Sequence, residues 1–109
     1  MALTYRVLGQ INPTANTLTT LYTVPAANST IASTLVICNL ANTTASFSLA
    51  VQPAGAAIAN KYYINYNTPL PPNDSITLTI GMTLGNTDVV SANASTNNVS
   101  FSLFGSEIS

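Results

Sequence analysis

Apolar and polar residues alternate along much of this chain with the period of two that is typical of β-strands. In the stretch 45–51, the side chains of Phe47, Leu49 and Val51 fall on one face and small residues fall on the other. Because successive side chains of a strand point to opposite faces of its sheet, this pattern predicts a half-buried strand. The stretch 31–38 is more uniformly apolar and β-branched. We therefore expect it in the middle of a sheet, with both of its faces covered.

The polar segment 39–44 joins these two stretches, and together they predict a β-hairpin with arms at 31–38 and 45–51. The sequence motif Ser-Phe-Ser-Leu of the second arm recurs near the end of the chain, within 99–104. This recurrence predicts a second hairpin, whose first arm is 89–94. The two hairpins should place four apolar side chains in one core: Phe47, Leu49, Phe101 and Leu103.

The remaining strands follow the same alternation. We expect them at 2–10, 18–24, 61–66 and 75–80. The segment 53–60 is irregular, with room for one helical turn at 54–59, whereas three prolines in 67–74 predict a rigid connector outside any sheet. About eight short strands without a helical period predict an all-β fold, a two-sheet β-sandwich with either jelly-roll or immunoglobulin-like connectivity.

The length of the chain suits one domain with its own core, so we treat residues 1–109 as a single β-sandwich domain. Residues 1–10 are expected to form a strand at the edge of a sheet. An edge strand presents an open row of hydrogen-bonding groups, so this strand either completes its own sheet or is exchanged with a neighbouring copy. The sequence leaves both arrangements open.

Charged residues are rare in this chain. They make up 5% of it, whereas about 25% is typical of soluble domains. With two cations the chain cannot neutralise a run of phosphates, so we expect no nucleic-acid partner. Weak self-repulsion favours association, and we expect a homo-oligomer whose contact includes the terminal segments 2–8 and 99–104. The charged residues are Arg6, Lys61, Asp74, Asp88 and Glu107.

The chain offers little catalytic or metal-binding chemistry. It has no histidine and one cysteine, which removes the usual general base, the serine triad and most zinc sites. Asp74 and Asp88 stand beside turn residues, where a carboxylate usually caps its turn instead of forming a catalytic pair or a calcium site. Cys38 lies within an apolar run and is interpreted as an inert core thiol. We therefore predict a protein that is not an enzyme, with no catalytic residue, no cofactor and no metal.

Neither a secretory signal nor a membrane span is visible in the sequence. The first residues lack an extended apolar segment, and Arg6 follows the first apolar residue instead of preceding it. No apolar run approaches the length of a membrane-spanning helix. We expect synthesis in a cytoplasm and no membrane partner.

The segment Lys61-Tyr-Tyr-Ile-Asn-Tyr66 is the aromatic cluster of the chain. On a regular strand, Tyr62 and Tyr66 share one face with Ile64, while Tyr63 points to the other. These rings either pack at the rim of the sheet or form a contact patch, because tyrosine is enriched at protein interfaces and sugar-contacting surfaces. The candidate interface residues are Tyr5, Arg6, Lys61, Tyr63 and Phe104.

Five short sequence motifs, taken in their order along the chain, are the basis of a resemblance that covers nearly the whole chain. They are LYTVP at 21–25, LVICN at 35–39, FSLAVQPAG at 47–55, NKYYI at 60–64 and FSLFGSE at 101–107. Taken together, they resemble small virion structural proteins of tailed bacteriophages, especially phages of cyanobacteria and marine bacteria.

The resemblance implies a non-enzymatic β-sandwich protein located in the virion, most like a capsid cement (decoration) protein. Such a protein binds the outside of the lattice of the major capsid protein on the capsid surface and stabilises the head. The alternative is a tail, baseplate or fibre component that binds host-surface glycans. The resemblance also allows placement at the tail or baseplate, and the glycan contact is a hypothesis from the tyrosine cluster and the Asn-rich loops. Synthesis would then take place in the host cytoplasm. The family provides no catalytic motif.

Overall fold

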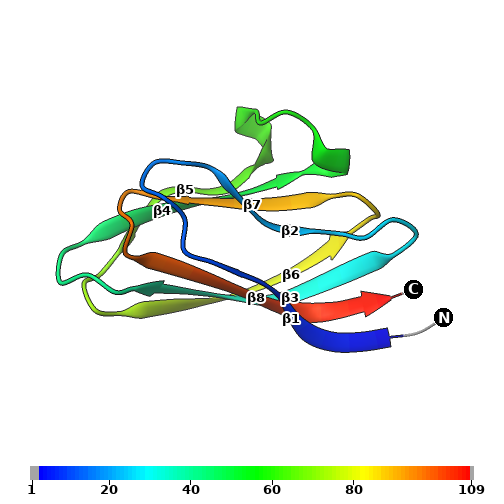
Figure 1. Ribbon diagram of the computed structural model, residues 1–109, viewed down its shortest axis with the longest axis horizontal. Coiled ribbons are helices and arrows are strands. Elements are labelled where there is room, and N and C mark those ends of the chain that lie inside the picture. The colour runs from blue at the N-terminus through cyan, green and yellow to red at the C-terminus, as the bar shows by residue number, and fades with distance from the viewer. Residues whose placement is uncertain (1–2, 109) are drawn as a thin grey trace.

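Two antiparallel four-stranded sheets face each other in the computed structural model, which describes residues 3–108 (Figure 1). The order of strands is β1-β8-β3-β6 in one sheet, called sheet A here, and β2-β7-β4-β5 in the other, sheet B. This arrangement confirms the predicted eight-stranded β-sandwich. Ala2, part of the predicted first strand, lies outside the described residues. The strands are β1 (Leu3–Ile11), β2 (Thr19–Thr23), β3 (Ser29–Asn39), β4 (Ala45–Gln52), β5 (Tyr63–Leu70), β6 (Ser75–Leu84), β7 (Val89–Ala94) and β8 (Val99–Ile108).

The connectivity is that of a jelly roll. The strands pair in a nested order, β1 with β8, β2 with β7, β3 with β6 and β4 with β5. These four pairs result when one long antiparallel ribbon wraps around a core, which is the jelly-roll arrangement and differs from the immunoglobulin-like one. The edge strands of sheet A are β1 and β6, and β1 pairs with β8 of the same chain.

Both predicted hairpins are wrong. β3 and β4 lie in different sheets, and so do β7 and β8. The segments 40–44 and 95–98 therefore cross from one sheet to the other instead of turning back within one. The alternation within each strand is unaffected by this difference, because it reports which face of a strand is buried and carries no information about its hydrogen-bonding partner.

The buried side chain of Asn39 stabilises the first crossing segment, residues 40–44 between β3 and β4. Its Nδ2 donates hydrogen bonds to the carbonyl oxygens of Thr43, Leu70 and Pro71 at 2.9, 3.2 and 3.1 Å. The two loops it joins, after β3 and after β5, lie at the same end of the sandwich. These bonds satisfy the buried amide and hold the two loops together.

The four core residues predicted from the repeated Ser-Phe-Ser-Leu motif are confirmed. Phe47, Leu49, Phe101 and Leu103 are each at most 1% exposed. The rings of Phe47 and Phe101 meet edge to face across the two sheets, with centroids 6.3 Å apart and planes at 69°. Each copy of the repeated Ser-Phe-Ser-Leu motif therefore contributes apolar side chains from its own sheet to a shared core.

Several strands differ from the predicted ranges. β5 continues through Pro69, which pairs with Ser46 although 67–74 was expected to be a connector. Proline is tolerated there because β5 is an edge strand, where an N–H on the open side is not needed. β6 likewise continues to Leu84, past Gly81 with its φ of +56°.

β3 lies in the middle of sheet A as predicted, but its outer face is not covered. Ile31 on that face is 41% exposed. Cys38 is only partly buried, so it is not the core thiol that the apolar run suggested. Both predictions failed because an apolar run of this length also occurs on a strand with one open face.

The segment between β4 and β5 leaves the sandwich and lies above sheet B (Figure 1). It contains two short 3-10 turns, η1 (Pro53–Gly55) and η2 (Asn60–Tyr62). The helical turn expected within 54–59 is not formed, because Ala54 has a φ of +52° and residues 56–59 have no regular secondary structure. The backbone N–H of Ala54 donates to Asp88 Oδ1 at 2.8 Å, which ties η1 to the loop before β7.

Candidate functional site

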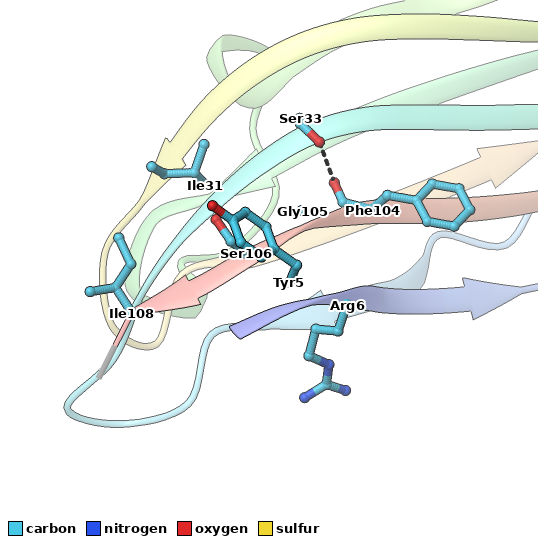
Figure 2. Close-up of a pocket in the computed structure, with 8 residues that line it drawn as sticks. All are labelled: Tyr5, Arg6, Ile31, Ser33, Phe104, Gly105, Ser106 and Ile108. Carbon is cyan, nitrogen blue, oxygen red and sulfur yellow. Dashed lines mark hydrogen bonds between the residues drawn. The ribbon is translucent and has the colours of Figure 1, made fainter. Parts of the chain in front are cut away.

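A shallow depression of about 740 Å³ lies on the outer face of sheet A, near the chain ends (Figure 2). We call it the terminal-strand depression. It is formed by β1, β8 and β3, which are adjacent in the sheet. The residues that line it are Tyr5, Arg6, Ile31, Ser33, Phe104, Gly105, Ser106 and Ile108.

The register of the three strands explains why the surface is hollow here. Ser106 on the central strand pairs with Tyr5 on one side and with Ile31 on the other. Residues in register lie side by side across a sheet, so a small side chain is placed between two large ones. Tyr5 is 79% exposed and Ile31 is 41% exposed, whereas Ser106 is buried. Ser106 is therefore the floor and the two large side chains are the walls.

Gly105 allows the floor to form. A Cβ at this position would lie 2.1 Å from the carbonyl oxygen of Ile31, closer than any side chain can approach a backbone atom. The close approach coincides with a register irregularity in β3 between Ala32 and Thr34, where Ser33 Oγ donates to the carbonyl of Phe104 at 3.3 Å. A glycine is required where two backbones come this close.

A polar network lies on the opposite side of β1 from Tyr5. Arg6 points away from the depression (Figure 2) and its Nη1 donates to Glu107 Oε1 at 3.0 Å. Tyr22 of sheet B donates its hydroxyl to the other carboxylate oxygen, and this hydroxyl also lies 2.8 Å from Thr30 Oγ1. The network connects the two sheets and pairs Arg6 with Glu107 away from the apolar walls.

Within this network, Tyr22 is the titratable group whose pKa is clearly shifted. Burial, together with the hydrogen bond to Glu107, raises the pKa of the Tyr22 phenol from 10.0 to about 12. Both causes disfavour a phenolate, the first because it removes water and the second because a carboxylate repels the additional negative charge. Tyr22 is therefore a neutral donor at physiological pH.

A second surface lies at the edge of sheet B, where Asn60, Tyr63 and Tyr66 line a hollow of about 270 Å³. We call it the tyrosine notch. The rings of Tyr63 and Tyr66 meet edge to face, with centroids 5.0 Å apart and planes at 81°. Next to it, Lys61 Nζ lies 5.3 Å from the centroid of the Tyr62 ring, within the range of a cation–π interaction.

The expected division of the tyrosines between two faces of a strand is wrong. Tyr63 and Tyr66, predicted on opposite faces, contact each other. Tyr62 lies in η2, before the strand begins. The pairing of β4 with β5 also shifts register twice, between Phe47 and Leu49 and directly after Leu49. Each shift changes the direction of the side chains that follow, so strict alternation does not hold here.

The candidate interface residues fall into two groups. Tyr5, Arg6 and Phe104 line the terminal-strand depression. Tyr63 lines the tyrosine notch, and Lys61 is adjacent to it. Sequence reasoning did not single out five further residues that line the depression: Ile31, Ser33, Gly105, Ser106 and Ile108. The uniformly apolar stretch 31–38 gave no sign that Ile31 faces outward, and the partners of its strand were needed to place it beside Tyr5.

Both aspartates bond to nearby turn residues, and Asp88 also bonds to a distant segment. Asp74 Oδ1 accepts a hydrogen bond from the Ser75 N–H at 2.8 Å. Asp88 accepts one from Ala54 and, at 2.9 Å, one from Gly85. Among residues 3–108, no group of three or more His, Cys, Asp or Glu is placed to hold a metal ion. No helix in this part of the chain is long and apolar enough to cross a membrane.

Comparison with known proteins gives a structural likeness. No family model and no curated protein matches the sequence. Among solved structures, a chain in the structure of infectious bursal disease virus, Gt strain, superposes with a TM-score of 0.52 and 11% sequence identity. The match covers 97% of this chain and 30% of that chain. At this identity the likeness concerns the fold alone, so this protein shares its sandwich architecture with part of a larger viral chain.

Proposed function

We propose that the protein is a non-enzymatic virion structural protein, a cement (decoration) protein that binds the outside of the major capsid protein lattice. The observation that carries this proposal is the terminal-strand depression, an exposed and largely apolar surface on the outer face of sheet A. The shared fold with a chain of a virus structure and the resemblance to phage virion proteins support it. In this proposal the protein is synthesised in the host cytoplasm and is located on the capsid surface.

The chemistry of the depression suits an apolar protein contact. Tyr5, Val7 and Ile31 are each more than two-fifths exposed on the same face. Burial of apolar surface stabilises a contact by roughly 25 cal/mol per Å². Arg6, the nearest cation, is already paired with Glu107 and points away from the depression. Attachment to the shell therefore depends on apolar burial and neutral hydrogen bonds more than on ion pairs.

A homo-oligomer is part of the same proposal. β1 is an edge strand with nine residues, and its outer edge has no partner within residues 3–108. Such an edge is a template for pairing with another chain. Several weak contacts held together in one closed oligomer strengthen one another through effective concentration. Sedimentation of the full-length protein as a monomer at high concentration would contradict this part of the proposal.

Rebinding to particles that lack the protein tests the capsid contact. The variant Tyr5→Ser with Ile31→Ser should lose about tenfold or more in bound copies at a fixed protein concentration, because both walls of the depression are removed. Tyr66→Ser is the matched control, an exposed tyrosine on the other sheet, and should bind normally. Equal binding of all variants would overturn the proposed contact.

Two further measurements distinguish this placement from a tail component. The number of copies per purified virion should be in the hundreds, since a cement protein covers a lattice, whereas a tail tip holds a handful. Raising the salt from about 0.1 to 1 M shortens the screening length from roughly 10 to 3 Å but leaves apolar burial intact. The protein should remain on the particle, and release by salt alone would contradict an apolar contact.

A further inference from the structure

The tyrosine notch depends on an irregularity in strand pairing, because a regular strand would not bring these two rings together. Tyr63 and Tyr66 are three residues apart and would point to opposite faces of a regular strand. Two successive register shifts against β4 bring their rings to 5.0 Å instead. Bulges are over-represented at sheet edges and next to active sites, where they redirect side chains.

The notch exposes its aromatic surface. Tyr66 is 66% exposed although its ring is held against Tyr63. The edge-to-face arrangement orients the Tyr66 ring without covering it. A large aromatic side chain that is both fixed and exposed offers contact area at a low entropic cost.

From this geometry we propose that Asn60, Tyr63 and Tyr66 bind a neutral sugar ring of a glycan. One face of a pyranose carries C–H groups, which pack on an aromatic ring, and its edge carries hydroxyl groups, which both donate and accept hydrogen bonds. The two phenol hydroxyls and the Asn60 amide also donate and accept. The lining residues carry no charge, so a neutral sugar fits better than an anionic one.

A proline-rich peptide is the other ligand that aromatic notches take, and it fits less well here. Such peptides lie along a groove with several aromatic residues, and proline offers no N–H donor. This notch is one hollow of about 270 Å³ lined by three residues. It has room for one ring, and its donor and acceptor groups match hydroxyls.

The site is separate from the proposed capsid contact. β5 belongs to sheet B, and β1 and β8 belong to sheet A, so the notch and the terminal-strand depression are on different sheets (Figure 1). A copy that is attached to a shell through sheet A can therefore present the notch to its surroundings. The inference depends on the notch alone and stands whether or not the protein is located on a capsid.

Nuclear magnetic resonance titration of the full-length protein with simple sugars tests the inference. The probes are the methyl glycosides of glucose, galactose, mannose and N-acetylglucosamine at up to tens of millimolar. At least one should produce saturating shifts of the Tyr63 and Tyr66 ring signals, with a dissociation constant on the order of millimolar for a single ring. Tyr66→Ala should weaken binding about tenfold or more, and Tyr66→Phe should bind more tightly than Tyr66→Ala because it keeps the ring.

Tyr5→Ala is the matched control, because Tyr5 is 79% exposed but lies on sheet A. This variant should bind the sugars as the wild-type protein does. The inference is overturned by the absence of saturable shifts with every sugar, or by shifts that survive Tyr66→Ala. It is also overturned if a hexaproline peptide shifts the two ring signals and no sugar does so.

Discussion

The terminal-strand depression and the tyrosine notch are both exposed surfaces with aromatic side chains, but they are built in different ways. The depression lies across three strands with long pairings, each of which shifts register once. The notch lies on an edge strand whose pairing shifts twice within a few residues. A single shift in each long pairing leaves a broad, open hollow, and two close shifts produce a small corner between two rings.

This difference indicates two kinds of recognition. A broad surface with a small residue at its centre, Ser106 between Tyr5 and Ile31, suits a protein surface of complementary shape. A corner of two fixed rings suits one small chemical group. Both surfaces rest on the same core, and Phe47 with Phe101 connects the sheets that carry them.

The largest expected effect comes from removing that shared support. Phe47→Ala should lower the free energy of unfolding by about 3–5 kcal/mol, because it deletes a fully buried ring and leaves a cavity. The two surfaces should be lost together in one cooperative transition, measured by chemical denaturation with ring signals of Tyr5 and Tyr66 as probes. An unchanged midpoint, or separate transitions for the two probes, would contradict a common core.

A substitution beneath the terminal-strand depression should affect that surface and leave the tyrosine notch unchanged. Gly105→Ala should cost about 1–3 kcal/mol, since its Cβ would overlap the Ile31 carbonyl and force β3 and β8 apart. The depression should be distorted and sugar binding at the notch retained. Gly85→Ala is the control, because the nearest atom to its Cβ is 3.7 Å away and its φ is not positive. Equal stability of the two variants would show that the close approach at Gly105 is not required.

The network behind the depression should make stability fall at high pH. The folded pKa of Tyr22 is about 12, above its ordinary value of 10.0, so the unfolded phenol ionises first. The folded state then holds more protons, and the free energy of unfolding decreases as the pH rises from about 10 to 12, by up to about 2 kcal/mol. Below that range the contribution is fully present.

Tyr22→Phe removes this titration. The stability difference between wild type and Tyr22→Phe, measured by denaturation, should be constant up to about pH 9 and should shrink between about pH 10 and 12. A difference that is the same at both ends of this range would contradict a raised pKa of Tyr22 in the folded protein.

The smallest effect is expected from the ion pair. Arg6 and Glu107 have side chains that are 50% and 11% exposed, so Arg6→Gln should cost about 0.2–1 kcal/mol. Lys61→Gln removes a cation that makes no ion pair within residues 3–108 but contacts the Tyr62 ring, so its effect should depend less on salt. The Arg6 effect should also decrease in about 1 M salt. A larger loss than that of Gly105→Ala would mean that the network, and not the close backbone approach, maintains the depression.

Much of the strand pattern could be predicted from the residues. The alternation in 45–51 and 99–104 predicted the inward positions of Phe47 and Phe101, because the side-chain period of a strand is local. The missing histidine and the few charges also limit the chemistry that this chain can perform, and composition alone shows this. Tyr5 and Phe104 were named as candidate interface residues on the terminal segments, and the structure places both at one depression, while their role at an interface stays a prediction.

The tertiary structure decided which strands pair and where side chains from distant segments meet. The connection of 31–38 to 45–51 looks like a hairpin in the sequence, yet β3 and β4 lie in different sheets. Tyr63 meets Tyr66 because of register shifts that no local pattern encodes. The physical reason is the same in each case. Alternation depends on the geometry of one strand, whereas pairing and register depend on the packing of all eight around one core.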